Sequence, residues 1–334
     1  MSEAKYLMCF GDIHYRNENP ALRIDDYRAE IRDCLYEGLS FAADNEFDAV
    51  LFLGDNYDQP DPGGNVRNEL IDILNRQPNG EEWPFARYSL VGNHDIIGHQ
   101  LKTLKRTAIG TLGRSGVIIP GLGAGYSIEH TAEVPALSLY CAHFTHGVEF
   151  MDHTQSQSRI YALHANILRE PFFDDKYILC DDFQVGPHTQ LVITGHYHSG
   201  YATYKREDGV VFANPGSIAR IDSSSSIDRE VGVLLVKIED DKIGWKFHKL
   251  ESAKPGRKIF DLKTAEQNTV KRKKKDELHE KLKEIRLNKA VESGGASPID
   301  KFSIFAHQQN VSSDALSLVI ESYDEISINR KRSN

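Results

Sequence analysis

Five short clusters of carboxylate, amide and imidazole side chains lie in the first two thirds of the 334-residue chain. Each follows an apolar run, and in chain order they are Gly11-Asp12-Ile13-His14, Gly54-Asp55-Asn56-Tyr57-Asp58, Gly92-Asn93-His94-Asp95, His164 and Gly195-His196-Tyr197-His198. Oxygen and imidazole ligands together suit Mn, Fe or Zn rather than Ca or a thiolate-bound zinc. The clusters therefore predict two divalent metal ions with a catalytic role, with manganese as the first choice.

Hydrolysis of a phosphodiester at neutral pH requires a hydroxide ion and positive charge beside the phosphate oxygens. Two metal ions about 3.5 to 4 Å apart supply both, because they lower the pKa of a bridging water and bind the attacked phosphate. Ions this close share a ligand. Asp55 is the candidate bridging carboxylate, since it follows a predicted strand and lies between the other clusters in the chain. The sequence thus predicts metal-dependent phosphodiester hydrolysis by a metal-bridging hydroxide.

Size and composition predict one large globular domain with an appendage. A hydrophobic share of 40% and a charged share of 27% allow a sizeable buried core. The four cysteines form no CxxC pair, which excludes a zinc knuckle and favours a cytoplasmic location. We expect neither a signal peptide nor a membrane span, because no apolar run reaches about 18 residues. A net charge of −9 disfavours a lysine-coated surface, although bound cations would still attract nucleic-acid phosphates.

Short apolar runs bounded by Gly, Asp or Asn predict buried strands that end at the clusters. Between the first two runs, Ile31, Leu35, Leu39 and Ala42 recur at helical spacing and predict a helix within residues 25–44. Strand, helix and strand make a βαβ unit whose strand ends meet at one sheet edge, where ligands bind. The predicted strands are residues 6–10, 49–53, 88–91, 137–142, 160–163 and 191–194.

Four further runs, residues 200–206, 210–213, 231–238 and 245–250, predict antiparallel strands that form the second half of a two-sheet sandwich. Residues 1–252 are therefore predicted to be the dinuclear-metal domain. Residues 253–334 are predicted to be a helical C-terminal appendage. It contains a helix that begins at the basic run 271–275, a linker at 293–296 and two amphipathic segments within 297–326.

The ordered clusters resemble the calcineurin-like metallophosphoesterase superfamily over residues 5–220. Asn, Asp, Gly and His are common in turns after strands, so one cluster alone is a weak signal, but five in the same order are specific. The resemblance implies an α/β fold in four layers, with a two-sheet β-sandwich flanked by helices. It also implies that one ion is bound by Asp12, His14, Asp55 and His198, and the other by Asp55, Asn93, His164 and His196.

The same resemblance gives His94 and Asp58 catalytic roles. His94 is expected to protonate or stabilise the leaving oxygen, and Asp58 is expected to orient it as a carboxylate–imidazole pair. Asp95 is expected to support the loop. A further match, Asn214-Pro215-Gly216-Ser217, favours a backbone role at the metal site, although Asn-Pro-Gly is also ordinary turn chemistry.

His164 and His143 compete for one ligand position, because both follow apolar runs between the third and last clusters. His164 is preferred, since residues 159–164 run directly into a polar loop and the residues after it resemble repair-type phosphoesterases. His143, with His146 and His153, is then expected to line the cleft or to be a histidine at a strand end. Arg220, His143 and Asn214 are the candidates for substrate binding.

Other features of the sequence favour one class of phosphoester substrate over another. Gln59 stands where phosphoprotein phosphatases usually have Arg, and Asp95 where they have Glu. The crossover with Arg23, Asp25 and Asp26 ahead of its helix, together with the appendage, is similar to SbcD-type DNA repair nucleases. This resemblance implies a DNA nuclease whose C-terminal helices bind an SMC-like ATPase. Packing of these helices on the parent domain stays an equal alternative, and a homodimer stays open.

The sequence departs from the repair nucleases at two points, and these differences favour a second function as an alternative. The first motif continues His14-Tyr15-Arg16, whereas repair nucleases commonly have His-Leu-Gly, and the appendage is shorter than their capping domain plus helices. A small-molecule phosphatase or cyclic-nucleotide phosphodiesterase is therefore the alternative. A binding protein that has lost its chemistry is disfavoured, because every ligand position is filled.

Overall fold

The chain divides into two units, Met1–Leu262 and Lys263–Asn334. The computed structural model describes residues 4–117, 119–120, 131–134, 137–144, 154, 156–171, 177–223, 227–271 and 273–274. The first unit extends past Ser252, because Ile259 and Phe260 are buried in it. In the second unit, residues 263–271 and 273–274 are helical. The predicted segments within 297–326, and also His146 and His153, lie outside the described residues.

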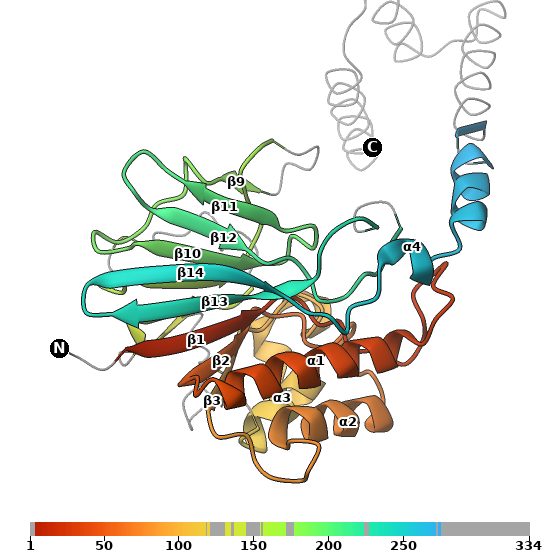
Figure 1. The fold of residues 1–334 in the computed structure, drawn as a ribbon, viewed down its shortest axis with the longest axis horizontal. Helices are drawn as coiled ribbons and strands as arrows, with labels where there is room; N and C mark the ends of the chain where they lie inside the picture. The colour runs from red at the N-terminus through yellow and green to blue at the C-terminus, as the bar shows by residue number, and fades with distance from the viewer. Residues whose placement is uncertain are drawn as a thin grey trace, which may run out of the picture. The chain divides into compact units, whose positions relative to one another are not determined.

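Two six-stranded sheets form the centre of the first unit (Figure 1). In the first sheet the strand order is β14-β13-β1-β2-β3-β4. Strands β1 to β4 run parallel, and the β13–β14 hairpin joins them with β13 antiparallel to β1. The bounds are β1 Lys5–Phe10, β2 Ala49–Phe52, β3 Ala86–Ser89, β4 Ile119–Pro120, β13 Gly232–Glu239 and β14 Lys242–Lys249.

The second sheet has the order β11-β12-β10-β7-β6-β5. Its four central strands are parallel, and antiparallel strands lie at both edges. The bounds are β5 Thr131–Val134, β6 Leu139–Ala142, β7 Ile160–His164, β10 Leu191–Gly195, β11 Tyr201–Lys205 and β12 Val211–Asn214; a separate pair is β8 Ile167–Leu168 and β9 Ile178–Leu179. The predicted two-sheet α/β fold is confirmed.

The four downstream strands are divided between the sheets, whereas the sequence predicted that they form one half of the sandwich together. β11 and β12 extend the second sheet, and β13 and β14 extend the first. The apolar residues of β13 explain the division: Leu234, Val236 and Ile238 pack in the core between the sheets beside Leu7 and Cys9 of β1. β13 therefore continues the inner face that β1 begins.

Three helices cover the outer face of the first sheet: α1 Tyr27–Asp44, α2 Gly64–Asn75 and α3 Ala108–Arg114 (Figure 1). The N-cap of α1 is Asp26, whose carboxylate accepts a hydrogen bond from Ala29 N at 3.0 Å. The apolar stripe predicted for this helix is buried, as expected for a face that packs on a sheet. The shorter elements are η1 Ile97–His99, η2 Leu101–Arg106 and α4 Gly256–Ile259.

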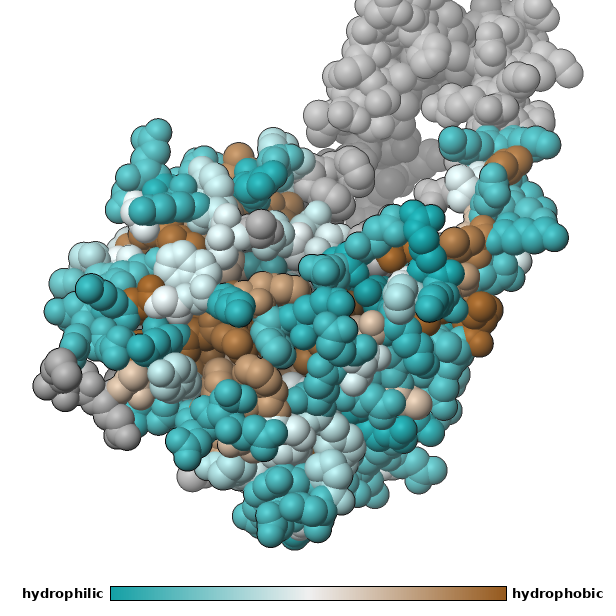
Figure 2. Space-filling view, viewed as in Figure 1, coloured by the Kyte–Doolittle hydropathy of each residue, from teal (hydrophilic) through white to brown (hydrophobic). Residues whose placement is uncertain are grey.

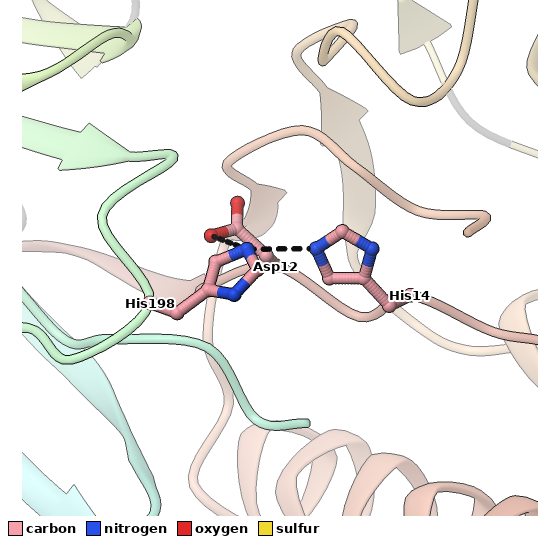
Figure 3. Close-up of side chains that lie close together, drawn as sticks. All are labelled: Asp12, His14 and His198. Atoms are coloured by element: carbon pink, nitrogen blue, oxygen red, sulfur yellow. Dashed lines mark hydrogen bonds and ion pairs between the residues drawn. The ribbon is translucent and has the colours of Figure 1, made fainter. Parts of the chain in front are cut away.

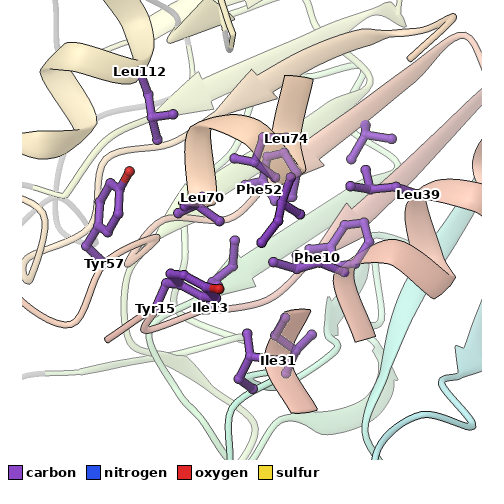
Figure 4. Packing of buried hydrophobic residues seen from close by; sticks show 14 of the residues in the cluster. Phe10, Ile13, Tyr15, Ile31, Leu39, Phe52, Tyr57, Leu70, Leu74 and Leu112 are labelled. Carbon is purple, nitrogen blue, oxygen red and sulfur yellow. The ribbon is translucent and has the colours of Figure 1, made fainter. Parts of the chain in front are cut away.

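Side chains along β1 alternate between the two faces of the first sheet, and each face contributes to a hydrophobic core. Phe10 points to the helices, where its ring stacks on Phe52 at 5.3 Å among Ile31, Leu39, Leu70 and Leu74 (Figure 4). Cys9 points to the other sheet, beside Cys141 of β6. Burial raises the pKa of the Cys9 thiol, so this cysteine is packed as a small hydrophobic residue.

The surface drawn in Figure 2 is largely hydrophilic, with hydrophobic residues gathered in the middle of the view over the β13–β14 hairpin. A cavity of about 420 Å³ lies there, lined in part by Tyr6, Phe41, Phe47 and Trp245. None of the helices in the described ranges is long and apolar enough to cross a membrane.

Candidate metal centre

The loops that follow β1 and β2 run side by side and continue the parallel pairing of these strands. His14 N donates to Asp55 O at 2.8 Å, and Tyr15 N donates to Asn56 O at 2.9 Å. Asp58 N then donates to Tyr15 O at 3.3 Å. Because the ladder extends past the strand ends, the first two clusters lie next to each other at the carboxyl edge of the sheet.

Asp12, His14 and His198 form a first group of potential metal ligands, with one ligand atom of each within 4.8 Å of the others. His14 Nε2 and His198 Nε2 are 2.9 Å apart, and His198 Nε2 is 3.7 Å from Asp12 Oδ2 (Figure 3). The Asp12 carboxylate also accepts hydrogen bonds from His196 N. Both sheets thus contribute to one site. Asp12 and His14 follow β1 of the first sheet, and His196 and His198 follow β10 of the second sheet.

A second group contains Asp55, His164 and His196. His164 Nε2 lies 3.3 Å from Asp55 Oδ2 and 3.1 Å from Asn93 Oδ1. The ring centroids of His164 and His196 are 5.0 Å apart. The structure therefore brings together the carboxylate, the amide and the two imidazoles that the sequence assigned to one ion.

Asp55 lies between the two groups. Its Oδ2 atom is 3.7 Å from His14 Nε2 and 3.3 Å from His164 Nε2, and the carboxylate is buried. Its Oδ1 atom accepts a hydrogen bond from His94 N at 2.8 Å. One oxygen is held by the backbone and the other faces imidazoles of both groups. This position fits a carboxylate shared by two cations.

The outer nitrogens of two histidines have the partners typical of metal ligands. His14 Nδ1 is 3.4 Å from Asp58 Oδ1, and His164 Nδ1 donates to Leu53 O at 2.7 Å. The hydrogen bond to Leu53 O fixes the tautomer of His164 that leaves Nε2 for a metal, and Asp58 places a carboxylate beside the corresponding nitrogen of His14. His143 differs, because its Nδ1 accepts a hydrogen bond from Val91 N at 3.1 Å. The geometry therefore favours His164 as the ligand and gives His143 a structural contact to the third loop.

Buried carboxylates shift the pKa values of the imidazoles in the second group. Burial by itself lowers the pKa of His164, but the negative charges of Asp55 and Asp12 outweigh it and raise this pKa to about 9. Burial, with the positive charge of His164, lowers the pKa of His196 to about 3. Because a metal binds the neutral imidazole, metal affinity at this group is expected to fall as the pH is lowered.

Three of the clustered residues have left-handed backbone conformations, which non-glycine residues rarely adopt. The φ angles are +46° for His14, +46° for Asp55 and +79° for His196. Backbone strain of this kind persists where the surrounding structure enforces it and gathers at functional sites. Close approach adds a further constraint, since a Cβ on Gly92 would lie 2.0 Å from Asp55 Oδ1. The glycine of this motif therefore makes room for the shared carboxylate.

A family model described as calcineurin-like phosphoesterase matches residues 6–200. The chain belongs to this family. Similar solved structures include a dimetal phosphatase from Danio rerio (12% identity, TM-score 0.48, 73% of this chain and 96% of that one). GAP50, the anchor in the inner membrane complex of Plasmodium, is 11% identical with a TM-score of 0.45, and the match covers 76% of this chain and 87% of that one. Purple acid phosphatase PPD1 from yellow lupin seeds is 12% identical with a TM-score of 0.45, and the match covers 76% of this chain and 53% of that one. The comparison with curated proteins found no match.

In this phosphoesterase, His94 is exposed beside the first group of ligands. Its Nδ1 lies 2.9 Å from Asp58 O, and its ring centroid is 4.8 Å from that of His14. The predicted carboxylate–imidazole pair between Asp58 and His94 is replaced by this contact to the Asp58 backbone carbonyl. The Asp58 carboxylate instead lies beside His14 Nδ1, with its second oxygen 3.1 Å from Arg16 Nη1. Extension of the β1–β2 ladder explains the exchange, because it places Asp58 next to residues 14–16.

Asp95 supports the loops of the phosphoesterase, as expected. Its buried carboxylate accepts hydrogen bonds from Gly92 N at 2.9 Å and Tyr57 N at 3.1 Å. Burial, together with the nearby charge of Asp55, raises the pKa of Asp95 to about 6. The side chain thus ties the second cluster to the third.

The segment 214–217 positions ligand loops through hydrogen bonds. Asn214 Oδ1 accepts from Gly216 N at 2.7 Å, and its Nδ2 donates to Thr194 Oγ1 at 3.1 Å. Ser217 Oγ donates to Asp12 O at 2.7 Å, and Ser217 N donates to His198 O at 3.0 Å. The contacts of Asn214 are therefore internal to the protein, and the expected backbone role belongs to the whole turn.

Arg220, predicted to reach a phosphate, is instead bonded to backbone carbonyls of the protein. Its side chain is buried, and its two terminal nitrogens donate to Lys254 O at 2.6 Å and Arg229 O at 2.8 Å. These contacts join Arg220 to the segment before β13 and to the segment after β14. A cation beside the site is instead Arg16, two residues after His14, to which the sequence analysis gave no role in the site. Tyr27 was also missed, and its hydroxyl donates to His14 O at 2.9 Å.

Replacing Asp58 with asparagine is expected to lower metal affinity by about 10- to 100-fold, as is typical when a partner of a ligating histidine is removed. The physical reason is that the carboxylate next to His14 Nδ1 raises the basicity of the ring. Burial by itself lowers the pKa of His14, but Asp58, Asp55 and Asp12 raise it overall. Titration of the metal-free protein with Mn²⁺ by calorimetry measures the change, and unchanged affinity would contradict this role.

Proposed function

We propose that this phosphoesterase hydrolyses phosphodiesters with two divalent metal ions and that its substrate is DNA. The observation that carries the first part is the place of Asp55, whose buried Oδ2 lies within 3.7 Å of an imidazole from each ligand group. When bound, the ions supply Lewis acidity and a nucleophile at neutral pH. A carboxylate at this point allows two cations to lie close together.

The proposal assigns two sets of ligands. The first ion is held by Asp12, His14, Asp55 and His198, and the second by Asp55, Asn93, His164 and His196. The distances support this division, because His14 of the first set and His164 of the second both lie within 3.7 Å of Asp55 Oδ2, and each has further ligands of its own set beside it. Mixed oxygen and nitrogen donors favour manganese, with iron or zinc as substitutes.

His94 is assigned the role of general acid, which donates a proton to the leaving oxygen. Its Nδ1 is fixed against Asp58 O, so the ring presents Nε2 as its second nitrogen. A histidine held on one side by a backbone carbonyl is free to transfer a proton on the other, which is the arrangement a general acid requires. Asp58 therefore acts on both neighbours, orienting His94 through its carbonyl and His14 through its carboxylate.

The choice of DNA depends on sequence features beyond the metal ligands. Gln59 and Asp95 depart from the phosphoprotein phosphatases, and the buried Asp95 has a structural role. The crossover around Arg23 and the C-terminal appendage are similar to SbcD-type repair nucleases. We include in the proposal an SMC-like ATPase partner for residues 297–326, which pull-down of such an ATPase with the full chain would test.

A side-by-side assay in Mn²⁺ tests the substrate. The substrates are single-stranded DNA, duplex ends, a cyclic dinucleotide and an aryl phosphodiester, and gel analysis follows the DNA products. We expect cleavage of DNA and of the aryl phosphodiester, both lost when EDTA removes the metal. Activity confined to the cyclic dinucleotide and the aryl ester would overturn the DNA assignment and favour the small-molecule alternative.

A further inference from the structure

An aromatic side chain lies directly beside the second group of metal ligands. The ring of Phe144 has its centroid 5.7 Å from that of His196 and 6.1 Å from that of His164. His99 extends this surface, with its ring 5.6 Å from Phe144 and nearly perpendicular to it at 81°. Phe144 is partly exposed and His99 is exposed. We call Phe144 and His99 the aromatic wall.

The fold places the aromatic wall at the site for a local reason. Phe144 follows β6, the neighbour of β7, and β7 ends at His164. Phe144 N donates to Val91 O at 2.8 Å, which joins the end of β6 to the loop of the third cluster. The wall therefore stands where the parallel strands of the second sheet end, beside the residues that would hold the second ion.

His99 is held in an unusual backbone conformation. Gly98 and His99 both have positive φ angles, +57° and +56°. Ile97 N donates to Thr103 Oγ1 at 3.0 Å, which closes the turn. A non-glycine residue keeps a left-handed conformation only where its surroundings enforce it. The turn thus presents an exposed imidazole at the edge of Phe144 instead of relaxing away from it.

We propose that the aromatic wall stacks against the nucleobase next to the scissile phosphate. This inference rests on the proposed function and deepens it, because it names a nucleoside as the group that the site holds beside the phosphorus. Every base has a flat π face, so stacking on Phe and His side chains holds a strand without reading its sequence. Phe144, the side chain nearest to the metal ligands, is apolar, which suits a base rather than a second phosphate.

Three phosphodiesters with the same 4-nitrophenolate leaving group test the wall: the thymidine 5′-ester, the ethyl ester and the hexyl ester. Because chemistry at phosphorus is shared, differences in kcat/KM report binding of the other group. We expect the wild-type chain in Mn²⁺ to prefer the thymidine ester over the ethyl ester by about tenfold, the size of one base–aromatic stack. A hexyl ester preferred as strongly as the thymidine ester would overturn the proposal, since any apolar surface would then suffice.

Two substitutions at Phe144 separate stacking from packing. Phe144→Leu keeps an apolar side chain and removes the ring, whereas Phe144→Trp keeps a ring. We expect Phe144→Leu to reduce the preference for the thymidine ester about tenfold, and Phe144→Trp to retain it. His99→Ala, at an exposed position, is expected to reduce it in the same direction. An equal fall for all three esters would mean that Phe144 only supports His164 and His196, and the proposal would fail.

Binding without turnover separates failure of this inference from failure of the proposed function. Calorimetry in Mn²⁺ compares thymidine 5′-monophosphate with ethyl phosphate, and we expect the wild-type chain to bind the nucleotide about tenfold more tightly. Phe144→Leu should bring the two affinities together. If none of the esters is hydrolysed but the nucleotide still binds more tightly than ethyl phosphate, the phosphodiesterase assignment fails and the inference about the aromatic wall is retained. Equal wild-type affinities refute the wall whatever the activity.

Discussion

Replacing Asp55 with asparagine is expected to remove both metal ions and to lower turnover by at least about a thousandfold, since the pair contributes several kcal/mol of transition-state stabilisation. The hydrogen bond from His94 N to Asp55 Oδ1 decides how an amide would sit. The asparagine oxygen would stay on this donor, and the NH₂ group would take the place of Oδ2. A donor would then face His14 and His164, where a cation needs an acceptor.

Metal content per chain, measured by mass spectrometry after equilibration with Mn²⁺ and gel filtration, checks this expectation. Asp228 provides a matched control, because its carboxylate is exposed and paired with Arg257. Asp228→Asn should retain two ions and full activity. If Asp55→Asn keeps either ion at full occupancy, Asp55 is not the shared ligand. Thermal unfolding in EDTA shows whether the variant is folded before its metal content is compared.

Replacing His94 with alanine is expected to leave both ions bound and to lower kcat by about 10² to 10⁴, the contribution typical of a general acid. The side chain is exposed, and its ring contacts a backbone carbonyl rather than the core. Its removal should therefore affect proton transfer more than folding. The effect should also depend on the leaving group, since a weakly basic leaving group needs little protonation.

Paired assays on DNA and on a 4-nitrophenyl phosphodiester test the role of His94. The loss of kcat/KM should be much larger for DNA, whose leaving alkoxide is strongly basic, than for 4-nitrophenolate. An equal loss on both substrates would assign His94 to charge stabilisation instead of proton transfer. Loss of metal from His94→Ala would place the side chain among the ligands, since His94 also lies within reach of His14 and Asp55.

The strands that end at the clusters could be predicted because their buried runs are short and sharply bounded. The helix after β1 was predicted from its apolar stripe, and Ile31, Leu35, Leu39 and Ala42 are all buried. The third strand was placed too late, since β3 ends at Ser89 and the next apolar residues form the loop to Gly92. Leu90 and Val91 are both buried. Their apolar side chains therefore do not show whether the segment is a strand or a buried loop, because either structure would place them in the core.

Partners of the site residues could not be predicted, because hydrogen bonds depend on distances between loops. Asp58 has the right type and spacing to orient His94, yet its carboxylate is 3.4 Å from His14 Nδ1. Arg220 follows the last motif as a phosphate ligand would, but it donates to backbone carbonyls of Arg229 and Lys254. In both positions the chain offers several acceptors, and only packing selects one.

The sequence by itself determined the set of chemical groups and the order in which strands deliver them, because ligand type and strand periodicity are local properties of the chain. The tertiary structure decided which groups meet. It placed Asp55 between imidazoles that come from different sheets, and it brought His164 beside Asp55 and Asn93 while His143 Nδ1 accepts a hydrogen bond from Val91 N. The physical reason is packing: His143 follows β6 and His164 ends β7, and the packed sheets bring the Leu53 carbonyl to the ring of His164 and the Val91 amide to the ring of His143.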